Sequence, residues 1–336
     1  MQVILGGPGS SGSSLLSEKL RDAVREVSLP ELSLFNKPTL YNDWERAKFL
    51  IVKNSRRLET QGWFPYPRTR ISSLDLGWTE KEINEMIVAS RSLIEFSDLL
   101  FSKKMSDVGA NGWIEKTPSN AYCFDYFLAQ RTNNRVILCV RNPYDTVASL
   151  VNRGMSPYFA AGLWLYNTVA ALRCFSSDRF LLVRYEDLLS DPDEQISRIC
   201  SFANLNRRSD SDKKAENIDD PGGVHLYRKI ESWKFDPSGA IAKSNSTFDS
   251  FDEYNQSLII AAISSIKVRL DDRPVPLKSG WISIPDLLPE LTYSEIPMRG
   301  QHRLALQGQF IFDYCKRALL HYHSSLSGYP AKLDIK

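Results

Sequence analysis

The loop from Gly6 to Ser14 (GGPGSSGSS) carries residues that could bind an anionic group. It follows the apolar run Gln2 to Gly6 and precedes residues 13–27, whose apolar positions recur at helical spacing. A strand, a Gly-rich turn and a helix in this order leave backbone N–H groups at a helix N-terminus, where they bind phosphate. The glycines permit a close backbone approach. Hydroxyl donors are added by Ser10, Ser11, Ser13 and Ser14. The segment predicts a phosphate-binding loop, with a purely structural turn as the alternative.

A second candidate site begins at Arg141 in the segment RNPYDTVAS. This segment directly follows residues 135–140 (RVILCV), an apolar run typical of a buried strand in a parallel sheet. An arginine at the carboxyl end of such a strand points into the crevice where α/β folds bind ligands, and its planar fork suits a phosphate. Ser149 lies about two helical turns later and can face the same side. We predict a phosphate site here, although Arg141 in a surface ion pair is the alternative.

The third candidate, Trp113 to Pro118 (WIEKTP), also joins a short strand to a helix start. Glu115 could accept a proton from an acceptor group, and Lys116 could stabilise the charge of a group in transfer. A carboxylate with an ordinary pKa of about 4.3 is a weak base at neutral pH. Glu115 in this role would therefore need partial burial to raise its pKa. The alternative is an ordinary surface pair of Glu and Lys.

The first loop does not fit the ATP-binding pattern GxxxxGK[ST], because Ser13 stands where Lys is required. The sequence also offers no convincing aspartate for magnesium. A P-loop nucleotide-dependent kinase is therefore disfavoured, but it remains the main enzymatic alternative.

Together the three segments resemble the sulfotransferases that use 3′-phosphoadenosine 5′-phosphosulfate (PAPS), in order as well as content. The loop Gly7 to Ser14 is similar to the family's loop for the 5′-phosphosulfate, and RNPYDTVAS to its RNPxDxxxS segment for the 3′-phosphate. Tyr185 to Pro192 (YEDLLSDP) is similar to the YEDL segment, and Ser232 to Lys234 is a weaker match. The resemblance covers residues 2 to about 235.

The resemblance implies a PAPS-dependent sulfotransferase that releases adenosine 3′,5′-bisphosphate (PAP) and requires no metal. It implies Glu115 as general base and Lys116 as the residue that stabilises the sulfuryl group. It places Arg141 and Ser149 at the 3′-phosphate and Tyr185 near the adenine. The implied cofactor-binding residues are Gly9, Ser10, Ser11, Gly12, Ser13, Ser14, Arg141, Ser149 and Tyr185. The acceptor would present a hydroxyl or an amine, on a glycan, a lipid or a small metabolite.

One position departs from the family pattern. Most members carry Arg or Lys inside the first loop, where this chain has Ser10. A basic residue from elsewhere, such as Arg68 or Arg70, could then assist the backbone amides and Lys116. A catalytically impaired relative that binds PAP or PAPS without turnover is a further alternative.

The remaining elements follow from capping signals and apolar periodicity. We expect strands at 112–116, 135–140 and 180–184, and helices from Thr79 to about 104, 118–130, from Asn142, 156–175 and 191–203. Their alternation predicts an α/β, P-loop-kinase-like three-layer fold with a mainly parallel sheet. Beyond it we expect a mobile loop or lid at 204–220, a helix at 251–270, an irregular connection at 271–297 and a helix at 301–323.

The length of 336 residues suits one large domain. We assign residues 1–270 to the sulfotransferase domain, with a helical acceptor-side insertion at about 28–110. We expect residues 271–336 to be a C-terminal extension that packs on the same domain. The sequence leaves the oligomeric state open.

Charge and composition limit the partners and the location. The 42 basic and 40 acidic residues give a net charge of +2, so no global field favours nucleic acid or an anionic membrane. No apolar run approaches the roughly 20 residues of a membrane span, and residues 1–5 lack a signal-peptide pattern, so we expect a cytoplasmic protein. The five scattered cysteines show no metal-binding spacing and are expected to be buried free thiols.

Overall fold

The computed structural model describes residues 1–29, 31–53, 76–208, 246–269 and 280–297. Its centre is a five-stranded parallel sheet in the order β2-β3-β1-β4-β5. The strands are β1 (Gln2–Gly6), β2 (Val27–Leu29), β3 (Trp113–Lys116), β4 (Arg135–Val140) and β5 (Phe180–Arg184). The predicted α/β fold with a mainly parallel sheet and a P-loop-like strand, loop and helix at its start is confirmed.

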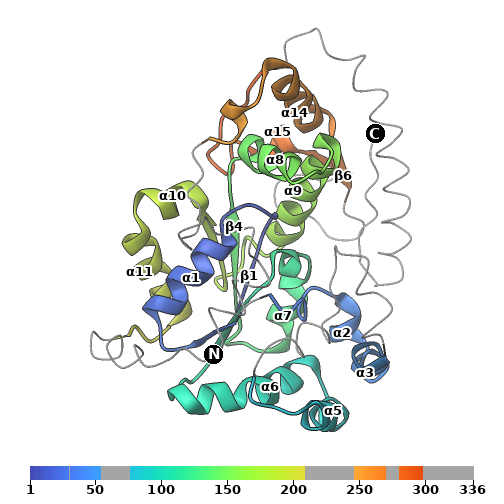
Figure 1. Ribbon diagram of the computed structural model, residues 1–336, viewed down its shortest axis with the longest axis vertical. Coiled ribbons are helices and arrows are strands. Elements are labelled where there is room, and N and C mark those ends of the chain that lie inside the picture. Colours follow the sequence, from blue (N-terminus) through green and yellow to red (C-terminus); the bar gives the residue numbers. More distant parts are fainter. Residues whose placement is uncertain (30, 54–75, 209–245, 270–279, 298–336) are drawn as a thin grey trace.

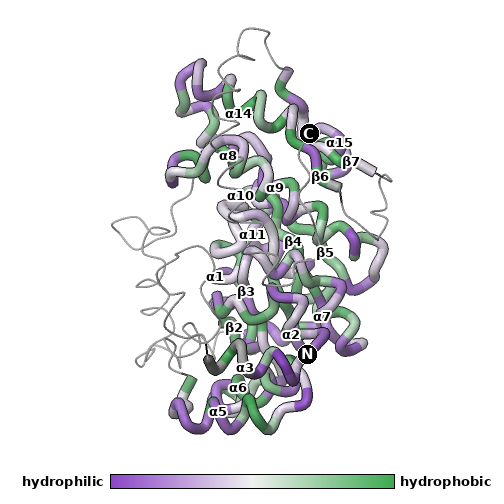
Figure 2. Tube along the Cα trace, turned by 90° about the vertical axis from the view of Figure 1, so that its right-hand side faces the viewer, coloured by the Kyte–Doolittle hydropathy of each residue, from purple (hydrophilic) through white to green (hydrophobic). Residues whose placement is uncertain are grey.

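Helices cover both faces of the sheet and make it the middle of three layers (Figure 1). One face packs against α1 (Ser13–Ala23) and α11 (Pro192–Ala203), with the short α10 (Tyr185–Ser190) beside them. The other face packs against the 3₁₀ helix η2 (Pro118–Cys123) and against α7 (Phe124–Gln130) and α9 (Pro157–Leu172). Figure 2 shows hydrophobic residues along β4 and β5 between these layers.

Alternate residues of the strands point into two separate cores. Val3 and Leu5 of β1 face the α1 layer, whereas Ile4 faces the opposite layer. The same alternation in β3 places Ile114 on the α1 side and Trp113 on the other. Successive side chains on a strand point to opposite faces, so neighbours in sequence serve different layers.

The remaining helices extend the layer opposite α1. They are α2 (Pro38–Asn42), α3 (Trp44–Lys53), α5 (Glu80–Ala89), α6 (Leu93–Val108), α8 (Pro143–Asn152), η4 (Phe248–Ser250), α14 (Glu253–Ser265) and α15 (Ile284–Leu287). Beside them, β6 (Lys267–Arg269) pairs antiparallel with β7 (Trp281–Ser283).

Two helix boundaries differ from the prediction. The first helix ends at Ala23 rather than at Val27, because residues 27–29 form the edge strand β2 on β3. The helix expected from Thr79 to about 104 is divided into α5 and α6 around Ser90 to Ser92. There the Ser92 hydroxyl accepts a hydrogen bond from the Glu95 N–H and caps a new helix, a local alternative to continuing the old one. The predicted capping box of Thr79 and Glu82 is present.

The prediction was also wrong for part of the C-terminal third. The helix expected at 251–270 ends at Ser265, because residues 267–269 form the strand β6 instead. Residues 281–287, expected to be irregular, form β7 and α15. A capping box between Ser283 and Asp286 starts α15, and this signal could have been read from the sequence.

Some predictions fall outside the described ranges. These are the lid beyond residue 208, the segment 232–234, the terminal helix at 301–323, Arg68, Arg70 and Cys315. The other four cysteines are free and buried, as expected.

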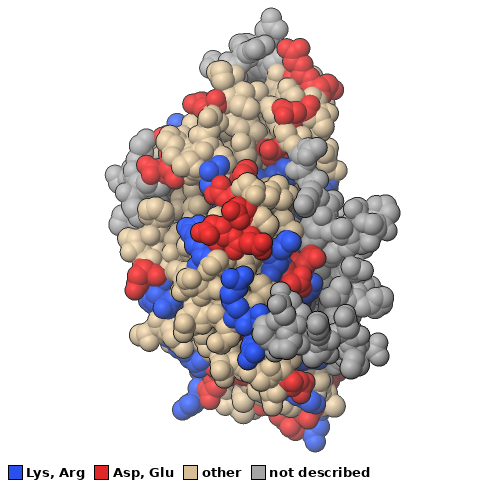
Figure 3. Space-filling model, turned by 90° about the vertical axis from the view of Figure 1, so that its left-hand side faces the viewer, with Lys and Arg blue, Asp and Glu red and all other residues tan. Residues whose placement is uncertain are grey.

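The described part of the chain shows neither a face of one charge sign in the view of Figure 3 nor a membrane-spanning helix. On the face that carries α1, α10 and α11, acidic and basic side chains are intermingled (Figure 3). Among the described helices, none is long and apolar enough to cross a membrane.

Candidate active site

The three motifs meet at one edge of the sheet. Because all five strands are parallel, their carboxyl ends lie at the same edge, where α/β folds bind ligands. The Gly- and Ser-rich loop follows β1 there, Thr117 follows β3, Arg141 follows β4 and Tyr185 follows β5. The fold therefore assembles segments that are far apart in the sequence.

The loop after β1 is tied to the neighbouring strand ends. The Ser11 hydroxyl, which has one hydrogen to donate, lies 2.6 Å from the carbonyl oxygen of Pro8 and 2.9 Å from that of Cys139, and its side chain is completely buried. The Gly7 N–H donates to the Pro118 carbonyl oxygen at 2.8 Å. The Ser11 hydroxyl thus stabilises the conformation of the loop. Ser11 could therefore contact a ligand only through its backbone. Ser13 is also buried, whereas Gly9 and Ser10 are partly exposed.

Gly12 is required at the end of the loop for two reasons. It caps α1 in a left-handed conformation, with a φ of 87°, which favours glycine. A Cβ at this position would also clash with the ring of Tyr185. Because Gly12 has no side chain to cap the helix, the first N–H groups of α1 remain available to an anion. The loop therefore suits a phosphate or sulfate group.

Arg141 is held beside this loop by three neighbours. Its guanidinium lies over the Tyr185 ring, 4.9 Å from the ring centre. Nη2 lies 3.3 Å from the Thr247 hydroxyl and 3.9 Å from the Asp145 carboxylate. The residue is 5% exposed, so it is not the surface ion-pair partner of the alternative interpretation. Ser149, two turns along α8, is partly exposed.

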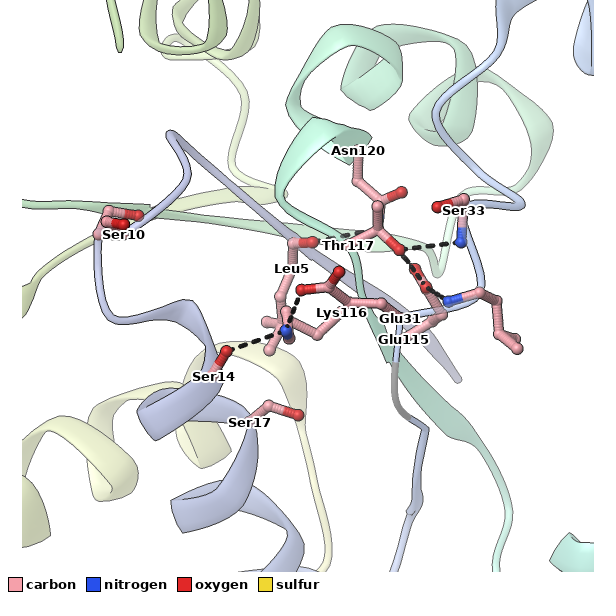
Figure 4. A network of polar contacts seen from close by, with 12 residues as sticks. Leu5, Ser10, Ser14, Ser17, Glu31, Ser33, Glu115, Lys116, Thr117 and Asn120 are labelled. Carbon is pink, nitrogen blue, oxygen red and sulfur yellow. Dashed lines mark hydrogen bonds and ion pairs between the residues drawn. The ribbon is translucent and has the colours of Figure 1, made fainter. Parts of the chain in front are cut away.

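Glu115 and Lys116 leave β3 on opposite faces of the sheet. The Nζ of Lys116 lies 3.0 Å from the Ser14 hydroxyl, at the start of α1, and 2.5 Å from a carboxylate oxygen of Glu31 (Figure 4). The Lys116 side chain is completely buried and the Glu31 side chain is 17% exposed. Lys116 therefore places its charge beside the loop that follows β1, at the start of α1.

Glu115 lies in a closed network on the other face. One carboxylate oxygen accepts hydrogen bonds from the Leu32 N–H (2.9 Å) and the Thr117 hydroxyl (2.6 Å). The other oxygen accepts one from Asn120 Nδ2 at 2.6 Å. Complete burial raises the pKa of Glu115 to about 7, against the opposite effect of these hydrogen bonds. The raised pKa agrees with a base that works near neutral pH, but the burial exceeds the partial burial expected.

Glu31 is a residue that sequence reasoning missed. It follows the edge strand β2, and the pairing of Leu29 with Glu115 brings the end of β2 beside β3. In sequence it is an isolated Glu in SLPELSL with no motif around it. A prediction of β2 as a strand next to β3 would have been the only signal.

The loop, the buried arginine and the lysine give this α/β protein a group of residues at the end of its parallel sheet that suits a phosphate- or sulfate-bearing ligand. The chain belongs to the sulfotransferase family, whose family model matches residues 2–210. No curated protein matches the chain significantly.

Several solved structures are similar to this chain. The sulfotransferase domain of the Synechococcus PCC 7002 olefin synthase is 21% identical, with 72% of this chain and 90% of that chain covered and a TM-score of 0.46. The sulfotransferase domain from the curacin biosynthetic pathway is also 21% identical (88% and 98% covered, TM-score 0.49). Sulfotransferase STF9 from Mycobacterium avium is 15% identical (89% and 78% covered, TM-score 0.43).

No group of three or more His, Cys, Asp or Glu side chains within the described ranges could hold a metal ion. The independence from metal stays a prediction.

Proposed function

We propose that this protein transfers a sulfuryl group from PAPS to a hydroxyl or amine of an acceptor and releases PAP. The observation that carries this proposal is the meeting of the uncapped start of α1, Lys116 and the buried Arg141 at one sheet edge. The family match supports the same reaction class.

The residues at this edge suit the two anionic ends of such a donor. PAPS donates the sulfuryl group, and the rest of the molecule leaves as PAP. In our proposal, the backbone from Gly9 to Ser14 binds the 5′ end through N–H groups at the start of α1. Arg141 and Ser149 bind the 3′-phosphate, because a planar guanidinium pairs well with phosphate oxygens. The Tyr185 ring holds the Arg141 guanidinium and flanks the adenine side of the site.

Lys116 suits the stabilisation of charge during transfer. In sulfuryl transfer, as in phosphoryl transfer, a protein contributes mainly by aligning the reacting groups and by stabilising the charge that is spread over the oxygens. A buried ammonium at the start of α1 acts where the dielectric constant is low, so its effect on a neighbouring anion is large.

Two carboxylates are candidates for the base that accepts the acceptor's proton. Glu115 is the residue predicted from the motif, but its oxygens already accept three hydrogen bonds in a buried network. Glu31 lies on the Lys116 side and keeps part of its surface open. The geometry favours Glu31 as the proton acceptor and Glu115 as the residue that orders the segment after β2 through the Leu32 N–H.

The acceptor is proposed by class only, as a glycan, lipid or small metabolite with a free hydroxyl or amine. The cytoplasmic location and the absence of a nucleic-acid partner also stay predictions from the sequence.

Calorimetric titration with PAP and, separately, with ATP and magnesium tests the donor assignment. We expect PAP binding that is lost in Arg141→Ala, with little ATP binding in either protein. Transfer of labelled sulfate from PAPS to a panel of glycan, lipid and phenolic acceptors then tests turnover. Binding of ATP without PAP would favour the kinase, and PAP binding without turnover on any acceptor would favour a catalytically impaired relative.

A further inference from the structure

Polar residues recur along α8 from Arg141, which precedes the helix, to Arg153, which caps its C-terminus beside the loop after β1. Arg141, Asp145, Ser149 and Arg153 recur every four residues, a spacing that places side chains on one helix face. The first two members of this series are adjacent in space, since Arg141 Nη2 lies 3.9 Å from the Asp145 carboxylate. Arg153 is the last member and the C-cap residue of the helix, with φ −91° and ψ 12°.

The end of this row contacts the loop directly. Nη1 of Arg153 donates a hydrogen bond to the Ser10 hydroxyl at 3.1 Å. Leu150 packs against the same part of the loop, since a Cβ on Gly9 would lie 3.7 Å from its Cδ2 atom. The Leu150 carbonyl oxygen also accepts the Arg153 N–H at 3.1 Å, which holds the last turn in place. The exposed guanidinium of Arg153 therefore lies at the loop tip as a consequence of the packing of α8.

The loop itself has no positive side chain between Gly6 and Ser14. A phosphate group carries about −1.5 to −2 charges near neutral pH, so cations near the loop matter for binding. Lys116 already faces the Glu31 carboxylate at 2.5 Å, and Arg141 faces Asp145. Lys116 also acts at Ser14, whereas Ser10 lies at the other end of the loop (Figure 4). A cation near Ser10 would add positive charge at the end of the loop that Lys116 does not contact.

We infer that Arg153 supplies this missing charge and binds the 5′-phosphosulfate end of the donor from α8. Ser10 assists, because its hydroxyl can accept from Arg153 while it donates its own hydrogen to an anion. Arg153 thus takes the place of a basic residue at position 10. The inference rests on the proposed function, since it assigns a further residue to the same donor site.

Calorimetric titration of the full chain with PAP and with AMP, which carries only the 5′-phosphate, tests this role. We expect Arg153→Ala to weaken the binding of both nucleotides about tenfold, the effect of losing one charge-assisted hydrogen bond. Arg198→Ala is the control, because Arg198 is an exposed arginine on α11 that donates to a side-chain oxygen, that of Gln195, away from the loop. It should leave both dissociation constants unchanged.

Two results would overturn the inference while leaving the proposed function intact. Weaker binding of PAP alone would assign Arg153 to the 3′-phosphate, and unchanged binding of both nucleotides would reduce it to a structural contact of Ser10. A wild-type protein that binds neither PAP nor AMP would overturn the proposed function, and the inference with it.

A rescue variant separates charge from structure. Ser10→Lys in the Arg153→Ala background places a cation inside the loop and should restore AMP affinity, whereas Ser10→Gln in the same background should not. Both replacements meet the same positive φ of 64° at position 10, so backbone strain is matched between them. Equal affinities in the two double variants would contradict a role of charge.

Discussion

The guanidinium of Arg141 lies over the ring of Tyr185, with 4.9 Å between the guanidinium carbon and the ring centre. The same ring packs against Gly12, which leaves no room for a Cβ there. Tyr185 thus joins the end of β4 to the phosphate loop, although the three residues come from three separate motifs. A change in the ring should therefore affect the binding of the nucleotide at both of its ends.

Tyr185→Leu should weaken PAP binding about tenfold, because it removes a cation–π contact and the ring that positions Arg141. Tyr185→Phe keeps the ring and should bind PAP as the wild type does. Calorimetry with PAP measures both variants, and thermal unfolding serves as a control for folding. An equal loss of affinity in the two variants would show that the hydroxyl, rather than the ring, is needed.

Gly12→Ala should lower both the melting temperature and the affinity for PAP. The left-handed conformation costs an L-residue about 1–2 kcal/mol, and the clash with Tyr185 adds to this cost. Gly154→Ala is the control, since Gly154 has nearly the same φ of 86° but nothing within 4 Å of an added Cβ. If both variants lose the same stability by urea unfolding, the close approach of Tyr185 is not what requires glycine.

The central sheet was predictable where local signals and tertiary packing agree. Residues 135–140 and 180–184 are apolar throughout because both of their faces are buried, and both were predicted as strands. β2 was missed because it is a three-residue edge strand whose pairing with β3 depends on contacts distant in sequence. Short edge strands have little periodicity of their own.

The candidate site was predictable only as far as its motifs extend. Arg141 and Lys116 occur in segments with a recognisable spacing, and the structure brings both to the end of the sheet near the loop. Glu31 and Arg153 lie outside the recognised motifs, although Arg153 follows Ser149 by one helical turn. Their places depend on the pairing of β2 with β3 and on the packing of α8 against the loop, which sequence reasoning did not resolve.

Glu31→Gln should lower kcat for sulfate transfer about 10²- to 10⁴-fold while PAP still binds, because a general base contributes about that factor. In Glu115→Gln we expect a smaller loss, since the side-chain oxygen that is retained can still accept from the Leu32 N–H and the Thr117 hydroxyl. Single-turnover kinetics with saturating PAPS measure the chemical step in both variants. The opposite order of the two losses would return the role of base to Glu115, as the motif predicts.

The pH dependence of stability should reveal the burial of Glu115. Its pKa is raised from 4.5 to about 7 in the folded protein, so between these values the folded state holds a proton that the unfolded state has lost. The free energy of unfolding should therefore fall by roughly 3 kcal/mol as pH rises from 4.5 to 7, and then level off. Glu115→Gln should remove this fall and thus gain stability relative to the wild type from pH 5 to pH 8.

Urea unfolding of both proteins at pH 5 and pH 8 measures the difference. Glu82→Gln is the control, because hydrogen bonds from Thr79 lower the pKa of Glu82 and it stays ionised over this range. A constant difference between Glu115→Gln and the wild type across pH would show that Glu115 titrates in the ordinary range.

Glu186 should act as a positioning residue for Arg141. One of its carboxylate oxygens accepts the Asn142 N–H at 2.8 Å and the other accepts the Tyr293 hydroxyl at 2.8 Å. Glu186→Ala frees the turn after Arg141 and should weaken PAP binding severalfold, whereas Tyr293→Phe keeps the Asn142 contact and should only lower stability by about 1 kcal/mol. Calorimetry and urea unfolding separate these effects. If Tyr293→Phe weakens PAP binding as much as Glu186→Ala does, the segment around Tyr293, rather than the Asn142 turn, is what positions the arginine.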